Sequence, residues 1–326
     1  MQNQTKIILD TDPGGDDIFA LLWLLSLVKQ GCVQLVAVTT AEGNVNKSVT
    51  FASASQVLNF TGFECIELGK GVVGNTDIED AAYIHGADGM GNISQTLPDV
   101  KHDYACARDS DDIIIDKLNA NPGEITLLAI APLTNLAVAE SKSPGILKKA
   151  KEVIVMGGAF TVPGNVTSKA EFNIAFNVEA AEVVFKSRND IVVLPLDITN
   201  QLIFTPEMAR KVYSHNPEKP VAKFVVQLCD FLTDTSLTYR QTEGKKGFLV
   251  HDAATVAYLF YPETLFLQRA RVEVETHGKL TKGQTIFDNR HIAKTDANAW
   301  VALKVDAANL LASFVEDLKV LLTYNS

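Results

Sequence analysis

Short apolar segments alternate with longer amphipathic segments along the first two thirds of the chain. The apolar segments are rich in β-branched residues and predict strands at 6–9, 33–40, 65–68, 125–130, 152–156 and 191–194. The amphipathic segments predict helices at 16–29, 46–60, 110–119 and 179–186, and a further helix that opens near residue 133. Because the strand segments are apolar throughout, we expect burial on both faces of a parallel sheet. The alternation is typical of an α/β fold with a doubly wound, mostly parallel central sheet and helices on both faces.

The pattern changes in the C-terminal third. It predicts helices at about 206–213 and 221–235, strands at about 266–275, 283–288 and 299–305, and a last helix from about 307. We interpret this part as a small C-terminal β/α extension. Since no linker-like segment divides the sequence, residues 1–326 are predicted to form a single domain. The connection 69–109 is long and contains several glycines, which is typical of a functional or mobile loop.

The composition narrows the class of protein. Of 326 residues, 47% are hydrophobic, and 29 basic against 39 acidic residues give a formal net charge of −10. Such a chain lacks the basic surface that nucleic acids or anionic membranes require. The N-terminus does not resemble a signal peptide, and no apolar stretch approaches the roughly 20 residues of a membrane helix. We therefore expect a cytoplasmic protein with neither nucleic-acid nor membrane partners.

A group of four aspartates directly follows the first predicted strand. Asp10 and Asp12 end the strand, a Pro-Gly-Gly turn follows, and Asp16 and Asp17 begin the next helix. Open α/β sheets bind ligands at the carboxyl ends of their strands. Clustered carboxylates repel one another unless a cation lies between them, and oxygen ligands favour Ca²⁺ or Mg²⁺. Alternatively, Asp16 and Asp17 only cap the helix and interact with its dipole, which leaves Asp10 and Asp12 unexplained.

Further polar runs follow other predicted elements. They are TTAEGN at 39–44, APLTN at 131–135, MGGA at 156–159 with GN and EFN up to residue 173, and HD at 251–252. If the sheet is parallel, the first three runs emerge at the same edge as the aspartates. Together with DTDPGGDD, these motifs resemble the nucleoside hydrolase family, in its inosine–uridine preferring branch of N-ribohydrolases. The resemblance runs in order from about residue 6 to residue 305.

The resemblance implies hydrolysis of the N-glycosidic bond of a ribonucleoside to ribose and free base. It also implies a tightly bound Ca²⁺, a homodimer or homotetramer, and a Ca²⁺-bound water that Asp12 activates as general base. The metal ligands would be Asp12, Asp17, Asp252 and the carbonyl oxygen of Ile130, with Asp10 supporting the cluster. The residues that would hold the ribose are Asp16, Asn44, Asn165, Glu171 and Asn173.

Three residues are expected on the side of the leaving base. His251, next to Asp252, is the candidate acid for the departing base, since histidine titrates near neutral pH. Tyr239 and His85 match family residues near the base. The alternatives are a structural role for His251, a buried amphipathic role for Tyr239, and a solvent-exposed loop position for His85.

The preferred base is less well marked in the sequence. The purine-specific branch stacks the base between tryptophans, one of them directly before the last metal-binding aspartate. Here His251 stands at that position, and Trp23 and Trp300 are expected in the core. The resemblance therefore favours a pyrimidine-preferring or broad enzyme that accepts uridine or inosine. Residues between Asn173 and Asp252 give little further indication.

Two other functions remain open at this point. A Ca²⁺-dependent nucleoside or ribose binding protein would use the same ligands without turnover. A haloacid dehalogenase-like phosphatase also places DxD after its first strand, but Asp16 and Asp17 have no place in its pattern.

Overall fold

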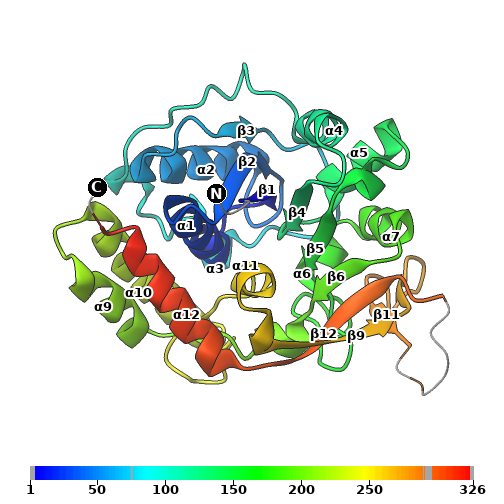
Figure 1. Cartoon of the computed structure of the whole chain (residues 1–326). Coiled ribbons are helices and arrows are strands. Elements are labelled where there is room, and N and C mark those ends of the chain that lie inside the picture. The colour runs from blue at the N-terminus through cyan, green and yellow to red at the C-terminus, as the bar shows by residue number, and fades with distance from the viewer. Residues whose placement is uncertain (1–3, 75, 289, 291–295, 324–326) are drawn as a thin grey trace.

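The computed structural model describes residues 4–74, 76–288, 290 and 296–323. An eight-stranded sheet runs through the middle of the molecule in the order β3-β2-β1-β4-β5-β6-β12-β9 (Figure 1). All neighbouring strands in it pair in parallel except β12 and β9, which are antiparallel. The strands of this sheet are β1 (Thr5–Thr11), β2 (Val33–Thr40), β3 (Glu67–Gly69), β4 (Ile125–Ala129), β5 (Glu152–Met156), β6 (Ile191–Leu194), β9 (Leu265–Ala270) and β12 (Ala299–Val305).

Helices cover both faces of the sheet, and each face has its own apolar core. One core contains residues of α1 (Gly15–Lys29), α2 (Lys47–Thr61), α8 (Leu196–Thr199), α9 (Pro206–His215), α10 (Pro220–Thr238), α11 (Ala253–Phe260) and α12 (Ala307–Val320). The other core contains residues of α4 (Ser110–Ala120), α5 (Thr134–Lys142), α6 (Phe172–Phe176) and α7 (Val178–Ser187). The predicted α/β fold with helices on both faces is therefore confirmed.

Helix α1 lies deeper in the molecule than its sequence pattern indicates. Residues on every side of it are buried, because α11 and α12 pack against the side that faces away from the sheet (Figure 1). The Trp23 indole stacks on Phe314 with ring centroids 4.5 Å apart, and its Nε1 donates to Asp317 at 2.7 Å. Trp23 is thus a core residue, as predicted.

Two of the C-terminal strands, β9 and β12, join the central sheet, whereas β10 (Val272–Val274) and β11 (Thr285–Phe287) form a small sheet of their own. β12 pairs with β6 and β9 pairs with β12, so the predicted extension continues the main sheet. Two small antiparallel two-stranded sheets complete the described strands, namely β7 (Ile203–Phe204) with β8 (Phe248–Leu249), and β10 with β11. The prediction that Trp300 lies in the core is wrong. Its side chain alternates to the solvent side of β12 and is 42% exposed, with the Arg269 guanidinium 5.4 Å from its ring.

The parallel register brings the carboxyl ends of the strands together. Asp10 at the end of β1 lies opposite Thr39 of β2 and Ala129 of β4, and β5 continues the row beside β4. The long connection after β3 contains only α3 (Ala82–His85) and the 3-10 helix η1 (Ser94–Thr96) among its described residues. The other 3-10 helices are η2 (Ile146–Lys149) and η3 (Pro262–Thr264). The described residues contain no helix that is long and apolar enough to cross a membrane.

Candidate active site

The turn between β1 and α1 folds around the carboxylate of Asp17. Its Oδ1 accepts hydrogen bonds from the Thr11 hydroxyl at 2.6 Å and from the Asp12 amide at 3.1 Å. Its Oδ2 accepts from the Gly14 amide at 3.2 Å. These donors hold Asp17 at the start of α1, where the helix dipole favours negative charge.

Asn44, which follows β2, links this turn to the neighbouring loop. Its amide N–H donates to Asp12 Oδ2 at 2.7 Å, and its side-chain Nδ2 donates to Asp17 Oδ2 at 2.9 Å and to the Asp12 carbonyl at 3.1 Å. Gly14 is needed beside it, because a Cβ there would come within 2.6 Å of Asn44 Nδ2 and 2.8 Å of His85 Nδ1. The glycines of the motif therefore make room for the side chains of the site.

Asp10 is completely buried below the cluster. Its Oδ1 accepts from the Thr39 hydroxyl at 2.6 Å and from Asn135 Nδ2 at 2.8 Å. Burial raises the pKa of Asp10 to about 7, although these two hydrogen bonds oppose the shift. Asp10 lies below the cluster, and Asn135 of the PLTN motif donates to it there.

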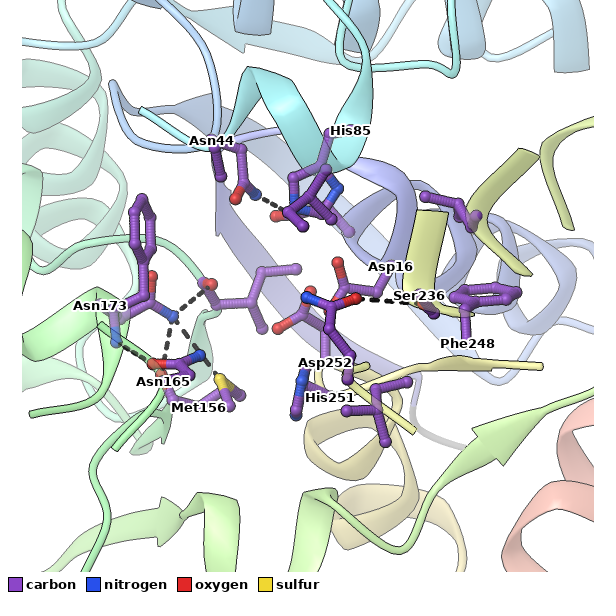
Figure 2. Close-up of a pocket in the computed structure, with 18 of the residues that line it drawn as sticks. Asp16, Asn44, His85, Met156, Asn165, Asn173, Ser236, Phe248, His251 and Asp252 are labelled. Atoms are coloured by element: carbon purple, nitrogen blue, oxygen red, sulfur yellow. Dashed lines mark hydrogen bonds between the residues drawn. The ribbon is translucent and has the colours of Figure 1, made fainter. Parts of the chain in front are cut away.

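Three further carboxylates meet at the floor of a pocket above Asp10. One oxygen each of Asp16, Asp17 and Asp252 lie within 4.8 Å of one another, with Asp252 placed at the start of α11. Burial, and then repulsion from the neighbouring carboxylates, raises the pKa of Asp252 well above its ordinary value, and burial raises that of Asp16 to about 7. Figure 2 shows Asp16 and Asp252 side by side, each reaching in from its own helix. This group of three differs from the predicted set of metal ligands. It contains Asp16, which the resemblance assigns to the sugar, and it does not contain Asp12.

The arrangement fits a bound cation. Asp12 is 1% exposed, and its Oδ1 has no hydrogen-bond partner among the described residues. A buried carboxylate oxygen without a donor is costly, and a positive ion removes that cost. The ligands on offer are all oxygen atoms, which suits a hard divalent cation. The site therefore contains an aspartate cluster able to bind such an ion.

A second group of polar side chains lies across the pocket from the aspartates. Asn173 Nδ2 donates to the Ile130 carbonyl at 2.9 Å and to the Met156 carbonyl at 3.1 Å, so it bridges the ends of β4 and β5 (Figure 2). Glu171 is buried at the start of α6 and accepts from the amides of Asn173 and Gly158, both at 2.9 Å. Burial raises the pKa of this carboxyl.

Asn165 belongs to the same wall. Its Oδ1 accepts from the Phe172 amide at 2.9 Å, and it lines the pocket together with Ile130, Glu171 and Asn173. The structure therefore brings the predicted ribose-binding residues of three different loops to one pocket.

Two histidines line the pocket next to the aspartates. The Gly15 amide donates to His85 Nδ1 at 2.9 Å, so the proton of the neutral His85 ring is on Nε2. His251 Nδ1 lies 2.7 Å from the Thr199 hydroxyl. Burial lowers the pKa of both rings to about 4, and for His85 the nearby His251 adds to this. Both rings are therefore neutral at pH 7.

Tyr239 is not among the residues that line this pocket. It is 50% exposed, and its ring packs edge-on against Tyr83, with centroids 5.0 Å apart. Tyr83 lines the pocket itself, two residues before His85. Tyr83 is not predicted from the sequence, and neither are the other lining residues on this side, which are Ile84, Leu232, Ser236, Gln241, Phe248 and Leu249. Tyr83 and Ile84 could have been suspected from their position next to His85, whereas the others carry no motif.

Comparison with known proteins agrees with this geometry. The model of the inosine-uridine preferring nucleoside hydrolase family matches residues 7–312. The chain is 36% identical over 312 residues to the non-specific ribonucleoside hydrolase RihC of Salmonella newport, which covers 94% of this chain and 95% of the relative. It is 31% identical to the probable uridine nucleosidase 1 of Oryza sativa subsp. japonica, over 97% of both chains.

A solved structure shows the same fold. The purine-preferring ribonucleoside hydrolase from Gardnerella vaginalis superimposes with a TM-score of 0.88 at 26% identity, covering 97% of this chain and 99% of that one. With the family model matching most of the chain, this protein belongs to the inosine-uridine preferring nucleoside hydrolase family and is a ribonucleoside hydrolase.

Proposed function

We propose that this hydrolase uses a Ca²⁺ ion held by Asp12, Asp17, Asp252 and the carbonyl oxygen of Ile130. The observation that carries this proposal is the buried Asp12 Oδ1 without a partner, beside the group formed by Asp16, Asp17 and Asp252. A Ca²⁺ bound there would orient the sugar hydroxyls and would lower the pKa of a water molecule. Asp16 and Asn44 then bind the sugar from one side, and Asn165, Glu171 and Asn173 bind it from the other.

Asp12 is the general base in this proposal. The N-glycosidic bond breaks and its electron pair leaves with the base, so positive charge develops on the anomeric carbon. The water oxygen forms the new bond to that carbon, and the water proton passes to Asp12 and later to solvent. Burial, and then repulsion from Asp17, raises the pKa of Asp12 well above its ordinary value when no cation is present, so a bound cation would be needed to keep this carboxylate ionised as the proton acceptor.

His251 and His85 stabilise the departing base. Because burial keeps both rings neutral, they act as N–H donors to its developing negative charge, and the base takes its final proton from solvent. The Nε2–H of His85 is available for this because Gly15 occupies Nδ1. Tyr239 contributes through its contact with Tyr83 at the rim of the pocket.

We further propose a pyrimidine-preferring or broad enzyme acting on uridine and inosine. Neither tryptophan lines the pocket, because Trp23 is in the core and Trp300 is on β12. His251 stands directly before Asp252, where the purine-specific branch has a tryptophan. One relative is named a probable uridine nucleosidase and another a non-specific ribonucleoside hydrolase, and both names support this preference.

The test is release of free ribose from uridine, cytidine, inosine and guanosine, with and without phosphate. We expect release that does not require phosphate and is fastest with uridine or inosine. 2′-Deoxyuridine is the matched control, because it lacks a hydroxyl that Asp16 and the cation would bind, and it should react far more slowly. Tight ribose binding without any turnover would instead indicate the nucleoside or ribose binding protein.

The remaining features of the proposal concern the whole chain. Two apolar cores on opposite faces of one sheet support a single domain over residues 1–326. The four free cysteines are compatible with a cytoplasmic location. We also propose a homodimer or homotetramer, and light scattering of the purified protein tests this oligomeric state. We propose no nucleic-acid or membrane partners.

A further inference from the structure

The base side of the pocket is largely apolar, with few polar groups. Leu232 of α10 and the neighbouring Phe248 and Leu249 of β8 form an apolar wall. Two polar side chains without a role so far, Ser236 and Gln241, line the pocket beside it. In a mostly apolar pocket, such isolated polar groups fix which ligand is accepted.

Gln241 is fixed in place by the turn that follows α10. Its amide N–H donates to the Ser236 carbonyl at 2.9 Å, and the Ser236 hydroxyl donates to Gln241 Oε1 at 3.1 Å, the dashed line at Ser236 in Figure 2. On either side of it, Arg240 and Glu243 adopt left-handed φ angles of 56° and 53°. The buried Thr242 hydroxyl closes the turn by donating to the Lys245 carbonyl at 2.6 Å. The turn therefore fixes the backbone of Gln241, and its exposed side chain lines the pocket with Oε1 turned toward the Ser236 hydroxyl.

This orientation leaves a hydrogen-bond donor free. Because Ser236 occupies Oε1, the remaining end of the Gln241 side chain is its Nε2 amide group, which makes no hydrogen bond within the described part of the chain. An NH₂ group donates and does not accept. It therefore matches a carbonyl oxygen, as on uracil or hypoxanthine, and does not match the amino group that cytosine or adenine carries in its place.

We propose that Gln241 determines specificity by donating a hydrogen bond to a carbonyl group of the base, and that Ser236 is its positioning residue. This inference rests on the proposed hydrolysis of nucleosides at the same pocket. It narrows the preferred substrates to nucleosides whose base carries an oxo group at C4 of a pyrimidine or C6 of a purine, so uridine is preferred over cytidine, which carries an amino group at C4.

The experiment compares kcat/KM for uridine and cytidine in the wild type and in Gln241→Glu and Gln241→Met. The carboxylate of Gln241→Glu accepts a hydrogen bond, so its uridine-to-cytidine ratio should fall by about tenfold or more, the size expected for one hydrogen bond gained or lost. Gln241→Met keeps the length of the side chain but neither donates nor accepts, so its ratio should fall toward one. Ser236→Ala should lower the ratio less, because it frees Gln241 to rotate.

Two controls separate this inference from a general loss of activity. Glu243→Gln changes the same turn at an exposed residue that does not line the pocket, and its ratio should equal that of the wild type. Inhibition by free ribose should be unchanged in every variant, since ribose has no base. An active Gln241→Glu or Gln241→Met enzyme with the wild-type ratio overturns the inference. Failure of the wild type to release ribose from any nucleoside overturns the proposed function instead.

Discussion

The two oxygens of Asp12 have different surroundings, and this allows a clean test of its role. Oδ2 accepts from the Asn44 amide, whereas Oδ1 has no partner in the described structure. In Asp12→Asn, the amide oxygen can keep the bond to Asn44, and the NH₂ group takes the place of Oδ1. The variant should therefore fold and, with Ca²⁺ in excess to offset the lost ligand oxygen, still bind ribose, but its amide is too weak a base to take the proton of the water. We expect kcat to fall by about 10²–10⁴.

The measurement is kcat for uridine together with the inhibition constant of ribose. Asp99→Asn, the same change at an exposed position, is the control and should behave as the wild type. Turnover of Asp12→Asn within a few-fold of the wild type would exclude Asp12 as the base.

At this scale, the sequence predicts residues that lie inside motifs but not those that depend on distant contacts. Asp12, Asp17 and Asn44 follow strand ends, and the parallel sheet brings them together. Gln241 and Ser236 lie in a segment without a recognisable pattern, and their role depends on a turn that only the folded chain defines. Thr199, which contacts His251, is 52 residues away from it along the chain.

Among the elements, α3 and the end of α10 form the rim of the pocket. They contact each other through Tyr83 and Tyr239, which are 61% and 50% exposed. Tyr83→Ala should leave stability nearly unchanged because the ring is exposed, but it removes an aromatic surface beside the base. We expect KM for uridine to rise several-fold, since an aromatic contact contributes about 0.5–1.5 kcal/mol, with little change in ribose inhibition.

A double-mutant cycle tests whether Tyr239 acts through Tyr83. Tyr239→Ala should also raise KM, and the double variant should be less impaired than the sum of the two effects. Phe266→Ala, at an exposed ring on β9, is the control for loss of an aromatic side chain. Strictly additive effects would show that the two rings act independently.

The elements that the sequence predicts well are helices long enough to show a period and strands that form an apolar, β-branched run. β2, β5 and β6 have the predicted bounds, and α1 and α4 differ by one residue at an end. The elements that it misses, α3, α6, α8, β7 and β8, contain two to five residues, too few for any periodicity. They nevertheless carry Tyr83, His85, Asn173, Thr199 and Phe248, so several pocket residues stand on elements without a sequence signal.

For the whole molecule, the fold is stable around a group of buried acids only if their charge is neutralised. Asp10 and Asp16 have their pKa raised to about 7, chiefly by burial, from an ordinary value of 3.8. Between about pH 4 and 7 the folded state then binds more protons at these groups than the unfolded state. This contribution to stability is therefore lost as pH rises through that range, and a cation restores it by replacing the protons.

The buried histidines act in the opposite direction. The pKa of His85 and that of His251 are lowered to about 4, so the folded state binds fewer protons there, and their contribution to stability grows between about pH 4 and 6.5. The melting temperature of the metal-free protein alone therefore mixes both effects. The rise in melting temperature on adding Ca²⁺ isolates the carboxylates, because the histidines are present in both samples.

We therefore expect this Ca²⁺-induced rise to be larger at pH 8 than at pH 5. At a hundredfold excess over its Kd, a ligand stabilises by about 2.7 kcal/mol, which corresponds to about 4 °C for a protein of this size. The measurement is thermal unfolding in chelator and in Ca²⁺ at both pH values, with Asp252→Asn as the variant in which the rise should be mostly lost. An equal rise at both pH values would show that the ion does not replace protons on these carboxylates, and no rise at either would remove Ca²⁺ from the site.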